Sequence, residues 1–552
     1  MQRLTHNAPT LLLAGALASA SVLTLVLTSK VTFYADTWDI LINRRDLTVD
    51  SLLKPHNEHL IAIPVLFEQV ILRVFGMSSA LPEYVLLTAF LLATAVLLYI
   101  YVKRRVGSWL ALFAAVLVLF LGPAWEAILS PFEIAFCGPI LCGLAMLLAL
   151  EREDRLGDVA ACAFLTLGLG FSSLGVPFVA AAAVAVLLGP RETWRRRAFV
   201  FVIPALVFVA WYAGWGHDAE SHVSLRNVLA APRYVADTIA VALGGLFGLG
   251  TAPEGGSIDP VWGRALLIAL VIVLGFRQYR RPGFDRTLWP VVAAAATSWF
   301  LTAFNSFPGR EPTSSRYQYA GAIFILLILA NLLKGVRPGR GAILAGFVIT
   351  ALAVGPNIVV LKEDGADYLR AQSVLTRADT SAIEIARRTV APDFQLTPEI
   401  AGTPVLVDIT AASYLQAVDE YGSPAYSVSE LEGAAEEGRR QADIVLANAL
   451  PLTLATKPGG PTPPSVAERC VTVPPGGGDP AGIPLSPGLH TIVVEPGPPA
   501  DITLRRFAGG EFPVTRRGIA GGSVSELRIP RDSVARPWRL RLEATQTASV
   551  CQ

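Results

Sequence analysis

Long runs of apolar residues, broken by short polar segments, fill residues 1–360 of this chain, whereas residues 361–552 mix polar and apolar positions. A helix of about 20 mainly apolar residues crosses the hydrocarbon core of a bilayer. The pattern therefore predicts a polytopic α-helical membrane domain followed by a domain of water-soluble character. The segments expected to cross are 9–31, 82–102, 108–122, 132–150, 157–172, 175–189, 198–215, 262–277, 288–304, 318–334 and 341–360.

Two further apolar segments, 59–76 and 231–249, carry more polar residues than a span usually holds. Glu68 and Gln69 interrupt the first and Asp237 the second, and ionisable groups are expensive at the centre of a bilayer. A helix lying in the membrane surface keeps such groups in contact with water. We therefore expect both segments to be juxtamembrane helices on the outer face. The alternative, that both cross the membrane, stays open.

Clusters of Lys and Arg between the apolar segments set the orientation, because such clusters stay in the cytoplasm. If the two surface segments do not cross, every cluster falls on the side of the N-terminus. About eleven spans result, and the chain is expected to be a multi-pass protein of the inner (plasma) membrane with its C-terminal domain outside. The clusters are Lys103–Arg105, Arg152 with Arg155, Arg191 with Arg195–Arg197, Arg277 with Arg280, Arg281 and Arg286, and Lys334 with Arg337 and Arg340.

The N-terminus begins like a signal peptide, with Arg3 before an apolar stretch and small residues near Ala20. The apolar run continues from Leu11 to Leu27, however, which is longer than the apolar region of a signal peptide. We expect an uncleaved first span.

The region after the last span changes character once more. Helix-like and short apolar stretches predict a small α/β subdomain, in which 403–409 and 442–450 are short buried segments. A linker rich in Pro and Gly follows at 457–468, and the short strands beyond it predict a β-sandwich. Acceptor recognition, carbohydrate binding, partner docking and a stabilising cap are all open as roles. The predicted domains are 1–362 for the membrane part, 363–456 for the α/β part and 457–552 for the β-sandwich.

Composition and cysteine usage agree with this organisation. Only 16% of the residues are charged against 53% hydrophobic, and the net charge of +1 gives no basic field for nucleic acid. Three cysteines fall in predicted spans, where Cys behaves as a small hydrophobic residue. Cys470 and Cys551 bracket the β region in an oxidising compartment, so we expect a disulfide between them.

Candidate chemistry lies in the predicted outer loops. Ionisable groups at the margin of a membrane are functional candidates, although loops that face water also collect polar residues. We interpret the loop from His217 to His222 as an ordinary solvent-facing loop. The other loops supply Asp36, Asp39, His56, Glu58 and His59 from the first, Trp125, Glu126 and Glu133 from the second, and Arg310, Arg316 and Tyr317 from a late one.

Asp36 and Asp39 are the leading acids, because they follow the first span directly and lie three residues apart. On a helical turn this spacing places both carboxylates on one face. Such carboxylates are suited to bind a divalent cation or to act as a general base, while capping of the following helix is the structural alternative.

The first span, the acid-bearing loop, the Pro-His segment and the amphipathic segment that ends in Phe75-Gly76 together resemble the GT-C superfamily. The PHNEH and AWEAILSPFE segments also resemble uncharacterised actinobacterial members. GT-C proteins are membrane glycosyltransferases that use polyprenyl-phosphate sugars. The resemblance implies juxtamembrane helices in the first outer loop and a first acid at Asp36 or Asp39. It implies a second acid at Glu133, or less directly at Glu126, where many members have Asp.

The resemblance also implies the reaction. The expected donor is a polyprenyl-phosphate sugar in the lipid bilayer, and the expected acceptor is a cell-envelope glycan. Asp36 or Asp39 would be the base or would bind Mg or Mn, and Arg310 or Arg316 would hold the phosphate. His56 and His59 would orient the phosphate or metal, or would only hold the loop. A lipid-linked sugar transporter and a non-catalytic scaffold for envelope assembly remain as alternatives.

Overall fold

The computed structural model covers the chain in two compact units. It describes residues 2–250, 259–280, 283, 285–403, 406, 409–457, 470–476 and 481–552. The first unit comprises 1–31, 44–71 and 80–369, and the second comprises 32–43, 72–79 and 370–552. Each unit is therefore built from segments that are far apart in the sequence, and the first outer loop contributes to both.

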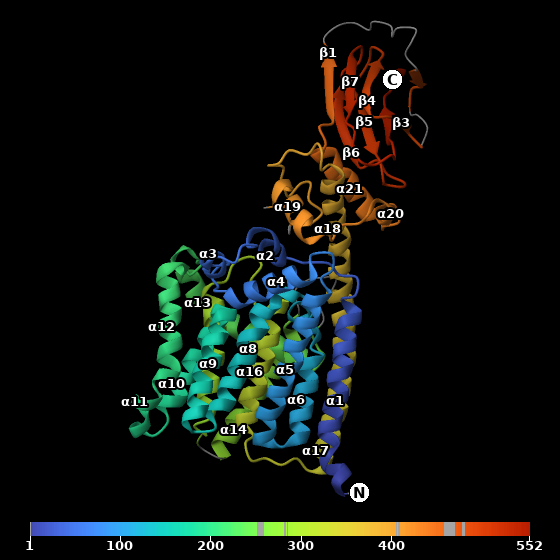
Figure 1. Cartoon of the computed structure of the whole chain (residues 1–552). Coiled ribbons are helices and arrows are strands. Elements are labelled where there is room, and N and C mark those ends of the chain that lie inside the picture. The colour runs from blue at the N-terminus through green and yellow to red at the C-terminus, as the bar shows by residue number, and fades with distance from the viewer. Residues whose placement is uncertain are drawn as a thin grey trace. The chain divides into compact units, whose positions relative to one another are not determined.

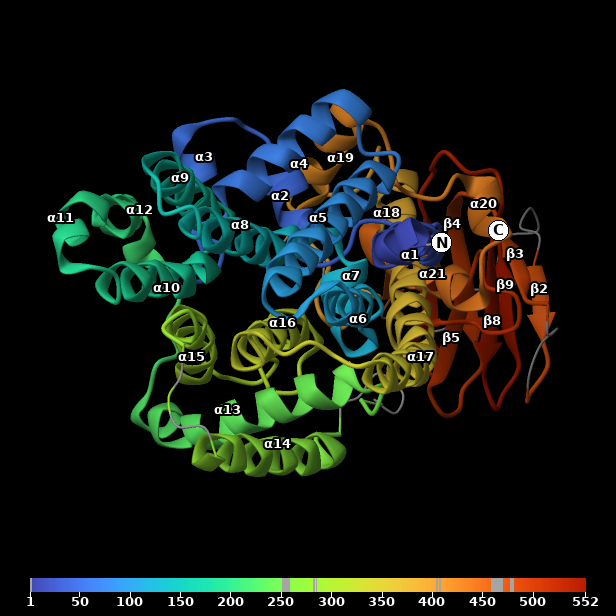
Figure 2. The ribbon, with the colours of Figure 1, turned by 90° about the horizontal axis from the view of Figure 1, so that it is seen from below.

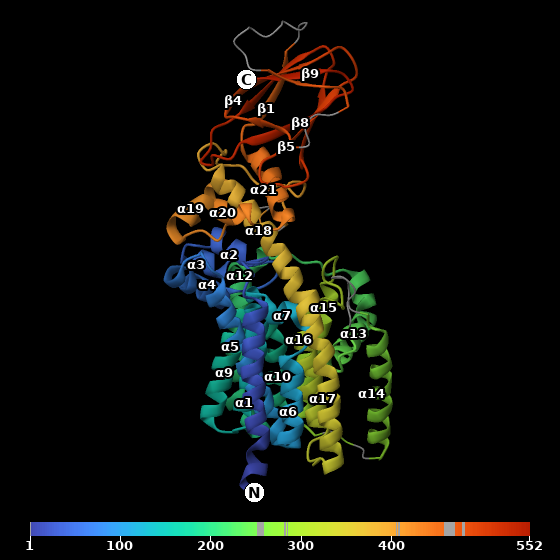
Figure 3. The same ribbon diagram turned by 90° about the vertical axis from the view of Figure 1, so that its right-hand side faces the viewer.

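The first unit is a bundle of long helices. Figure 2 views it end on, with α10, α15 and α16 beside one another, and Figure 3 shows α6 packed with α1 and α17. The bundle helices are α1 (Gln2–Leu27), α5 (Leu81–Val106), α6 (Ser108–Leu119), α8 (Ile134–Leu150), α9 (Arg155–Phe171), α10 (Val176–Leu187), α12 (Phe199–Gly214), α13 (Leu225–Leu246), α14 (Val261–Arg280), α15 (Leu288–Phe304), α16 (Ser315–Leu332) and α17 (Arg340–Val360).

Seven helices among the described residues are long and apolar enough to cross a membrane. Helix α6 and the segment 122–129 make an eighth if the bent pair, which turns by 52°, counts as one span. Helices α10 and α15 are apolar but shorter, while α13 and the 14-residue helix α4 (Ala62–Phe75) are not among the candidates. The chain thus has the apolar helices of a membrane protein, and the number of about eleven crossings stays a prediction.

The basic clusters gather at one end of the bundle. Arg104 and Arg105 both contact Glu151, at 2.7 Å each, and the Gly335 amide donates to the Arg105 carbonyl at 3.0 Å. At the same end Arg197 pairs with Asp158 at the start of α9, at 2.7 Å. Since α5 ends at this end of the bundle and α16 runs towards it, their first residues lie at the opposite end. These contacts place the basic clusters at the same end of the bundle, as the distribution of Lys and Arg along the chain predicts.

Helix α4 lies crosswise at the end of the bundle where α5 begins (Figure 1). We expected its polar residues to face water, and for two of them this is wrong. Glu68 is 2% exposed and Gln69 is fully buried, and the Gln69 amide donates to the Arg44 carbonyl at 2.7 Å. The reason is helical geometry, because adjacent positions 68 and 69 both lie on the face that covers the bundle, while Arg73 stays exposed.

The helices of the second unit are α2 (Thr37–Asn43), α18 (Tyr368–Ile385, which enters this unit at Arg370), α19 (Ala411–Tyr421), α20 (Val428–Glu432) and α21 (Glu436–Ala449). The predicted α/β subdomain at 363–456 is helical in its described residues, where the only strand is β1 (Thr453–Lys457). The segment 442–450 lies in α21 because Ala442, Val445, Leu446 and Ala449 recur with helical spacing and are buried. Residues 404, 405, 407 and 408 of the other segment lie outside the described residues.

No boundary falls at residue 362. Helix α17 continues through a π-helical turn (Leu361–Asp367) into α18, and the two units meet in the chain after Leu369. Most of the predicted linker, 458–469, lies outside the described residues.

The C-terminal strands form a β-sandwich of two antiparallel sheets, seen as two layers in Figure 3. One sheet has the order β1-β7-β4-β9-β2 and the other β3-β8-β5-β6. Trp538, Ile492 and Ile502 are buried in its core. Cys470 on β2 and Cys551 on β9 form a disulfide. The strands are β2 (Cys470–Val473), β3 (Ile483–Leu485), β4 (Gly488–Val494), β5 (Ala500–Arg505), β6 (Val514–Ile519), β7 (Val524–Ile529), β8 (Trp538–Glu543) and β9 (Ala548–Cys551).

Candidate functional site

A tight turn in the first loop presents the side chain of Glu58. The His56 amide donates to the His59 carbonyl at 3.0 Å, and the His59 amide donates back to His56 at 2.9 Å. Asn57 takes the left-handed conformation (φ 51°), which Asn tolerates better than most residues. Ser173, just before α10, accepts from the Leu60 amide and donates to the Glu58 carbonyl, so the turn is held on the bundle.

Arg310 forms a bidentate ion pair with Glu58. Its Nη1 donates to Oε1 of Glu58 and its Nη2 to Oε2, the latter at 2.8 Å, while His59 Nε2 lies 3.3 Å from Oε1. The two partners of the ion pair are only 12% and 23% exposed. Burial opposes ionisation of Glu58, but the hydrogen bonds and charges of His59 and Arg310 outweigh it and hold the pKa of this carboxyl well below its ordinary value. Glu58 is therefore a carboxylate at neutral pH.

The loop that carries Arg310 is itself fixed at several points. The guanidinium of Arg310 lies 4.6 Å from the centre of the Phe307 ring, and the Tyr234 hydroxyl donates to the Arg310 carbonyl at 2.9 Å. Gly309 has φ 93°, a conformation that side chains rarely adopt. Arg310 is thus held by its backbone, by an aromatic ring and by a carboxylate.

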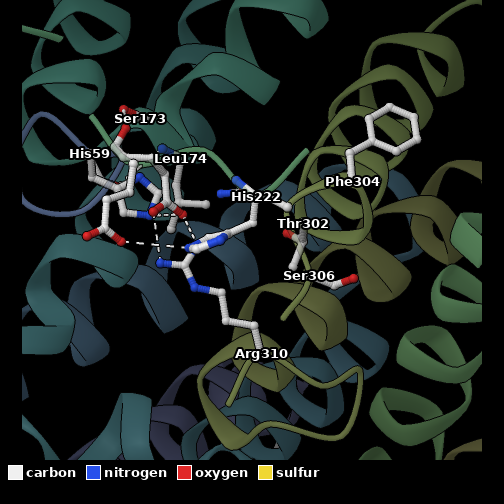
Figure 4. A network of polar contacts seen from close by, with 12 residues as sticks. His59, Ser173, Leu174, His222, Thr302, Phe304, Ser306 and Arg310 are labelled. Atoms are coloured by element: carbon white, nitrogen blue, oxygen red, sulfur yellow. Dashed lines mark hydrogen bonds and ion pairs between the residues drawn. The ribbon is translucent and has the colours of Figure 1, made fainter. Parts of the chain in front are cut away.

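His222 is a neighbour of this cluster that the sequence did not single out. Its ring centre lies 4.2 Å from that of Phe307, and its amide donates to Asn305 at 2.7 Å. Figure 4 shows Arg310 reaching towards both His59 and His222. The interpretation of the 217–222 loop as ordinary solvent-facing structure therefore misses one residue. No spacing in the sequence pairs it with the Arg310 loop, and only the fold does.

Aromatic rings just before α8 and in its first turn pack against the two histidines of the turn. His56 lies 5.2 Å from Phe132 and His59 lies 6.2 Å from Phe136, measured between ring centres. Glu133 follows Phe132 in the chain and is buried, 3% exposed. The structure therefore brings His56, Glu58, His59 and Arg310 together, with Glu133 beside one of the rings.

A second acid and arginine meet at the start of α16. Arg316 lies 3.5 Å from Glu126 on α7 (Trp125–Leu129), and the Glu126 amide donates to Ser315 Oγ at 3.0 Å. Tyr317 lies within electrostatic reach of both arginines and of both Glu58 and Glu126. Arg310 before α16 and Arg316 in its first turn thus each meet a carboxylate from another part of the chain, an arrangement suited to bind an anion that competes with the carboxylates. Trp125 packs on Tyr368 instead, with ring centres 5.6 Å apart.

Asp36 and Asp39 belong to the second unit. Asp36 directly precedes α2, and Asp39 lies in its first turn and accepts from Asn43 at 3.0 Å. Both carboxyl groups are half-buried. Ala35, just before them, has φ 49°, a strained value for alanine.

The expected cation lacks a complete set of protein ligands in the part of the chain that the structure describes. No three His, Cys, Asp or Glu side chains lie together there as a metal site. Mg²⁺ is commonly held by one or two carboxylates together with substrate phosphates. Asp36 and Asp39 would fit such a role only with ligands from the substrate.

Comparison with known proteins does not show a family for this chain. No protein-family model matches the chain, and no curated protein matches it. The crystal structure of ArnT from Cupriavidus metallidurans in the apo state is similar with a TM-score of 0.48 and 13% identity over 74% of this chain and 85% of that chain. The structure of the same protein bound to undecaprenyl phosphate gives 0.46 and 12% over the same shares. The function proposed below therefore rests on the residues of this chain.

Proposed function

We propose that this chain is a membrane glycosyltransferase of the GT-C type. It transfers a sugar from a polyprenyl-phosphate donor to a cell-envelope glycan or another acceptor on the outer face of the plasma membrane. The observation that carries the proposal is the bidentate Glu58–Arg310 pair, which lies at the end of the bundle opposite the basic clusters. The positive-inside rule puts the basic end in the cytoplasm, so the ion pair faces the outside.

Arg310 is the proposed ligand of the donor phosphate. A guanidinium presents paired N–H groups that match a carboxylate and a phosphate in the same bidentate way. Glu58 occupies this fork in the structure, so its carboxylate stands where two phosphate oxygens would be bound. Because Glu58 is ionised, an incoming phosphate must displace it, and His59 is placed to receive the released carboxylate.

Arg316 and Tyr317 extend the anion-binding region along the start of α16. The contact between Arg316 and Glu126 is longer than the Arg310 pair, and Arg316 is 34% exposed, so this guanidinium is the more accessible of the two. Tyr317, next to Arg316 in the chain, is the proposed source of a further hydroxyl. Together these groups would hold the phosphate and the first sugar hydroxyls, while the bilayer dissolves the polyprenyl tail beside the exposed apolar side chains of the bundle.

In the proposed transfer step, a proton moves to a carboxylate and a pair of electrons leaves with the phosphate. The acceptor hydroxyl oxygen attacks the anomeric carbon of the sugar, and its proton passes to the carboxylate of Asp36 or Asp39. The bond between that carbon and the phosphate oxygen breaks, and its electrons leave on the polyprenyl phosphate, whose charge Arg310 and Arg316 stabilise. Glu133 is the proposed second acid, close to the ring that covers His56. A divalent cation, if bound with substrate phosphate, would supply further charge stabilisation.

One observation favours the transporter alternative. Glu68 on α4 and Glu83 at the start of α5, a candidate span, are both 2% exposed. Buried carboxyl groups in a membrane domain are typical of proton or substrate pathways. A transporter would move a lipid-linked sugar without releasing polyprenyl phosphate, and this difference decides between the two functions.

The experiment measures release of undecaprenyl phosphate by the full chain in nanodiscs, with a panel of undecaprenyl-phosphate hexoses and pentoses and a cell-envelope glycan fraction as acceptor. We expect release with the native chain and its loss in D36N or D39N at unchanged thermal stability. D50N is the matched control, because Asp50 lies in the same loop and contacts Trp215 instead. Release that both D36N and D39N retain would overturn the assignment of the acids, and flipping of the donor without release would favour the transporter.

A further inference from the structure

Aromatic contacts and hydrogen bonds pack the segment that carries Asp36 and Asp39 within the second unit. Trp38 on α2 is fully buried, and its ring centre lies 6.2 Å from that of Tyr414 on α19. Phe33 packs edge-on against Trp38 at 5.7 Å and accepts from its indole N–H at 3.1 Å. The Thr32 amide donates to Ser373 on α18 at 3.0 Å. Side chains of the C-terminal region therefore hold this part of the first loop.

The backbone before Asp36 is strained. A left-handed conformation costs an alanine about 1–2 kcal/mol, and Ala35 adopts one with φ 49°. Such a residue persists only when its surroundings hold it, and here the Trp38 amide donates to the Ala35 carbonyl at 3.1 Å. Since Trp38 is fixed by Tyr414, the packing of the ring also holds the turn that directs Asp36 and Asp39.

Tyr414 is itself held rigidly. It is 1% exposed, and its hydroxyl donates to Glu384 at 2.7 Å, the same carboxylate oxygen that accepts from Ser423. Helix α19 begins with Thr410 accepting from the Ser413 amide. Burial and the hydroxyl contact thus hold the ring where it packs against Trp38.

We infer that Tyr414 and Trp38 are positioning residues for the acids of the first loop, so that the C-terminal region is part of the catalytic machinery and not a separate cap. This inference rests on the proposed function in so far as Asp36 or Asp39 takes part in transfer. The contact between the rings and the strained turn are independent of it.

The first test uses amide hydrogen exchange of the full chain in nanodiscs, which needs no activity. In Y414L the amides of 35–43 should exchange about tenfold faster or more, while those of α5 keep their native rate. Y414F keeps the ring and should restore slow exchange. Y426L is the matched control, because Tyr426 lies in the same unit but its ring contacts Arg377. Equal exchange of 35–43 in Y414L and Y426L would overturn the inference.

The second test separates kcat from KM for undecaprenyl-phosphate sugar. Y414L should lower kcat about tenfold or more with little change in KM for the donor, whereas Y426L should change neither. A35G offers a variant that folds readily, because glycine adopts φ 49° without strain. Glycine also adopts conformations other than this turn, so the acids should be held less firmly and kcat should fall while the chain stays folded. An A35G enzyme with native kcat would contradict the role of the strained turn. If no variant and no native chain releases polyprenyl phosphate, the proposed function fails, and the exchange rates still decide the positioning role.

Discussion

Arg310 and Glu58, which lie 252 residues apart in the chain, bind each other through both ends of the guanidinium fork. The pair joins the loop after α1 to the loop before α16, and His59 contacts the same carboxylate. An ion pair with little exposure and a geometry that a phosphate can copy is suited to be a structural link, a binding group or both. Separate substitutions of Glu58 and of Arg310 distinguish the structural role from the binding role.

Substitutions at Glu58 and Arg310 should have opposite effects on phosphate affinity. R310Q removes charge-assisted hydrogen bonds worth about 1.5–3 kcal/mol, so the affinity for undecaprenyl phosphate should fall about 10- to 100-fold. E58Q removes the competing carboxylate and should strengthen binding. Titration of undecaprenyl phosphate into the chain in nanodiscs measures both. Equal weakening by both variants would show that the pair is only structural.

Arg316 should contribute to donor binding through its charge. R316Q is expected to raise KM for the polyprenyl-phosphate sugar about tenfold, as the loss of one partly exposed charged contact implies. R264Q is the control, because Arg264 also lies in an exposed acid pair, with Asp237 at 2.7 Å. Steady-state kinetics of the two variants should differ, and identical KM values would remove Arg316 from the binding region.

The disulfide should stabilise the β-sandwich. Cys470 and Cys551 are 81 residues apart, and closing a loop of that length lowers the entropy of the unfolded chain by an amount worth about 4.5 kcal/mol in the chain-entropy model. The double variant C470S/C551S, or reduction of the native chain, should lower the unfolding temperature of the second unit. C162S serves as the control, because Cys162 is a free thiol in α9. A reductant should lower the unfolding temperature of C162S, which keeps the disulfide, but not that of C470S/C551S. Equal shifts of the two unfolding temperatures would contradict the assignment.

The stability of the second unit should depend on the proton of Asp443. Burial raises the pKa of this carboxyl to about 6. Hydrogen bonds from three backbone N–H groups and the charge of Arg506 lower the pKa, but by less than burial raises it. The folded chain therefore binds the proton more tightly than the unfolded chain. The resulting stabilisation is full below pH about 4 and is lost as the pH rises through about 6, by about 3 kcal/mol. D443N lacks this titration.

Thermal unfolding of the native chain and D443N between pH 4 and 7 measures the effect. The stability of the native chain relative to D443N should be greatest near pH 4 and should fall towards pH 7. A relative stability that rises over this range would have the wrong sign.

The orientation of the chain is testable with reporter fusions. A reporter at Gln552 should be active outside the cytoplasm, and one inserted at Gly335, beside Lys334, should be active inside it, because Lys and Arg clusters stay in the cytoplasm. A cytoplasmic reporter at Gln552 would overturn the topology and place the Glu58–Arg310 pair on the wrong side for the proposed reaction.

Local sequence patterns predict a helix or strand well where its apolar face or the length of its apolar segment determines the element. The apolar runs predict the bundle helices, and the strand segments around Ile492, Ile502, Leu527 and Leu540 lie in the sandwich. At 442–450 the pattern predicts a short buried segment without fixing its secondary structure, and β-branched residues such as Ile444 and Val445 favour strands. Four buried positions of α21 override that preference, since packing of a helix face outweighs the propensity of single residues.

The sequence by itself determined the class of the protein, the end of the bundle where basic residues collect, and the loops that carry acids, arginines and histidines. These features depend on composition and on the spacing of apolar residues over two to four positions, and both are visible in any short stretch of the sequence. Only the tertiary structure decided that Glu58 pairs with Arg310, that His222 joins them through Phe307, that Glu68 is buried, and that Trp38, between Asp36 and Asp39, packs on Tyr414 in the second unit. Such contacts join residues far apart in the chain, and their partners are selected by the packing of whole helices, which no local pattern specifies.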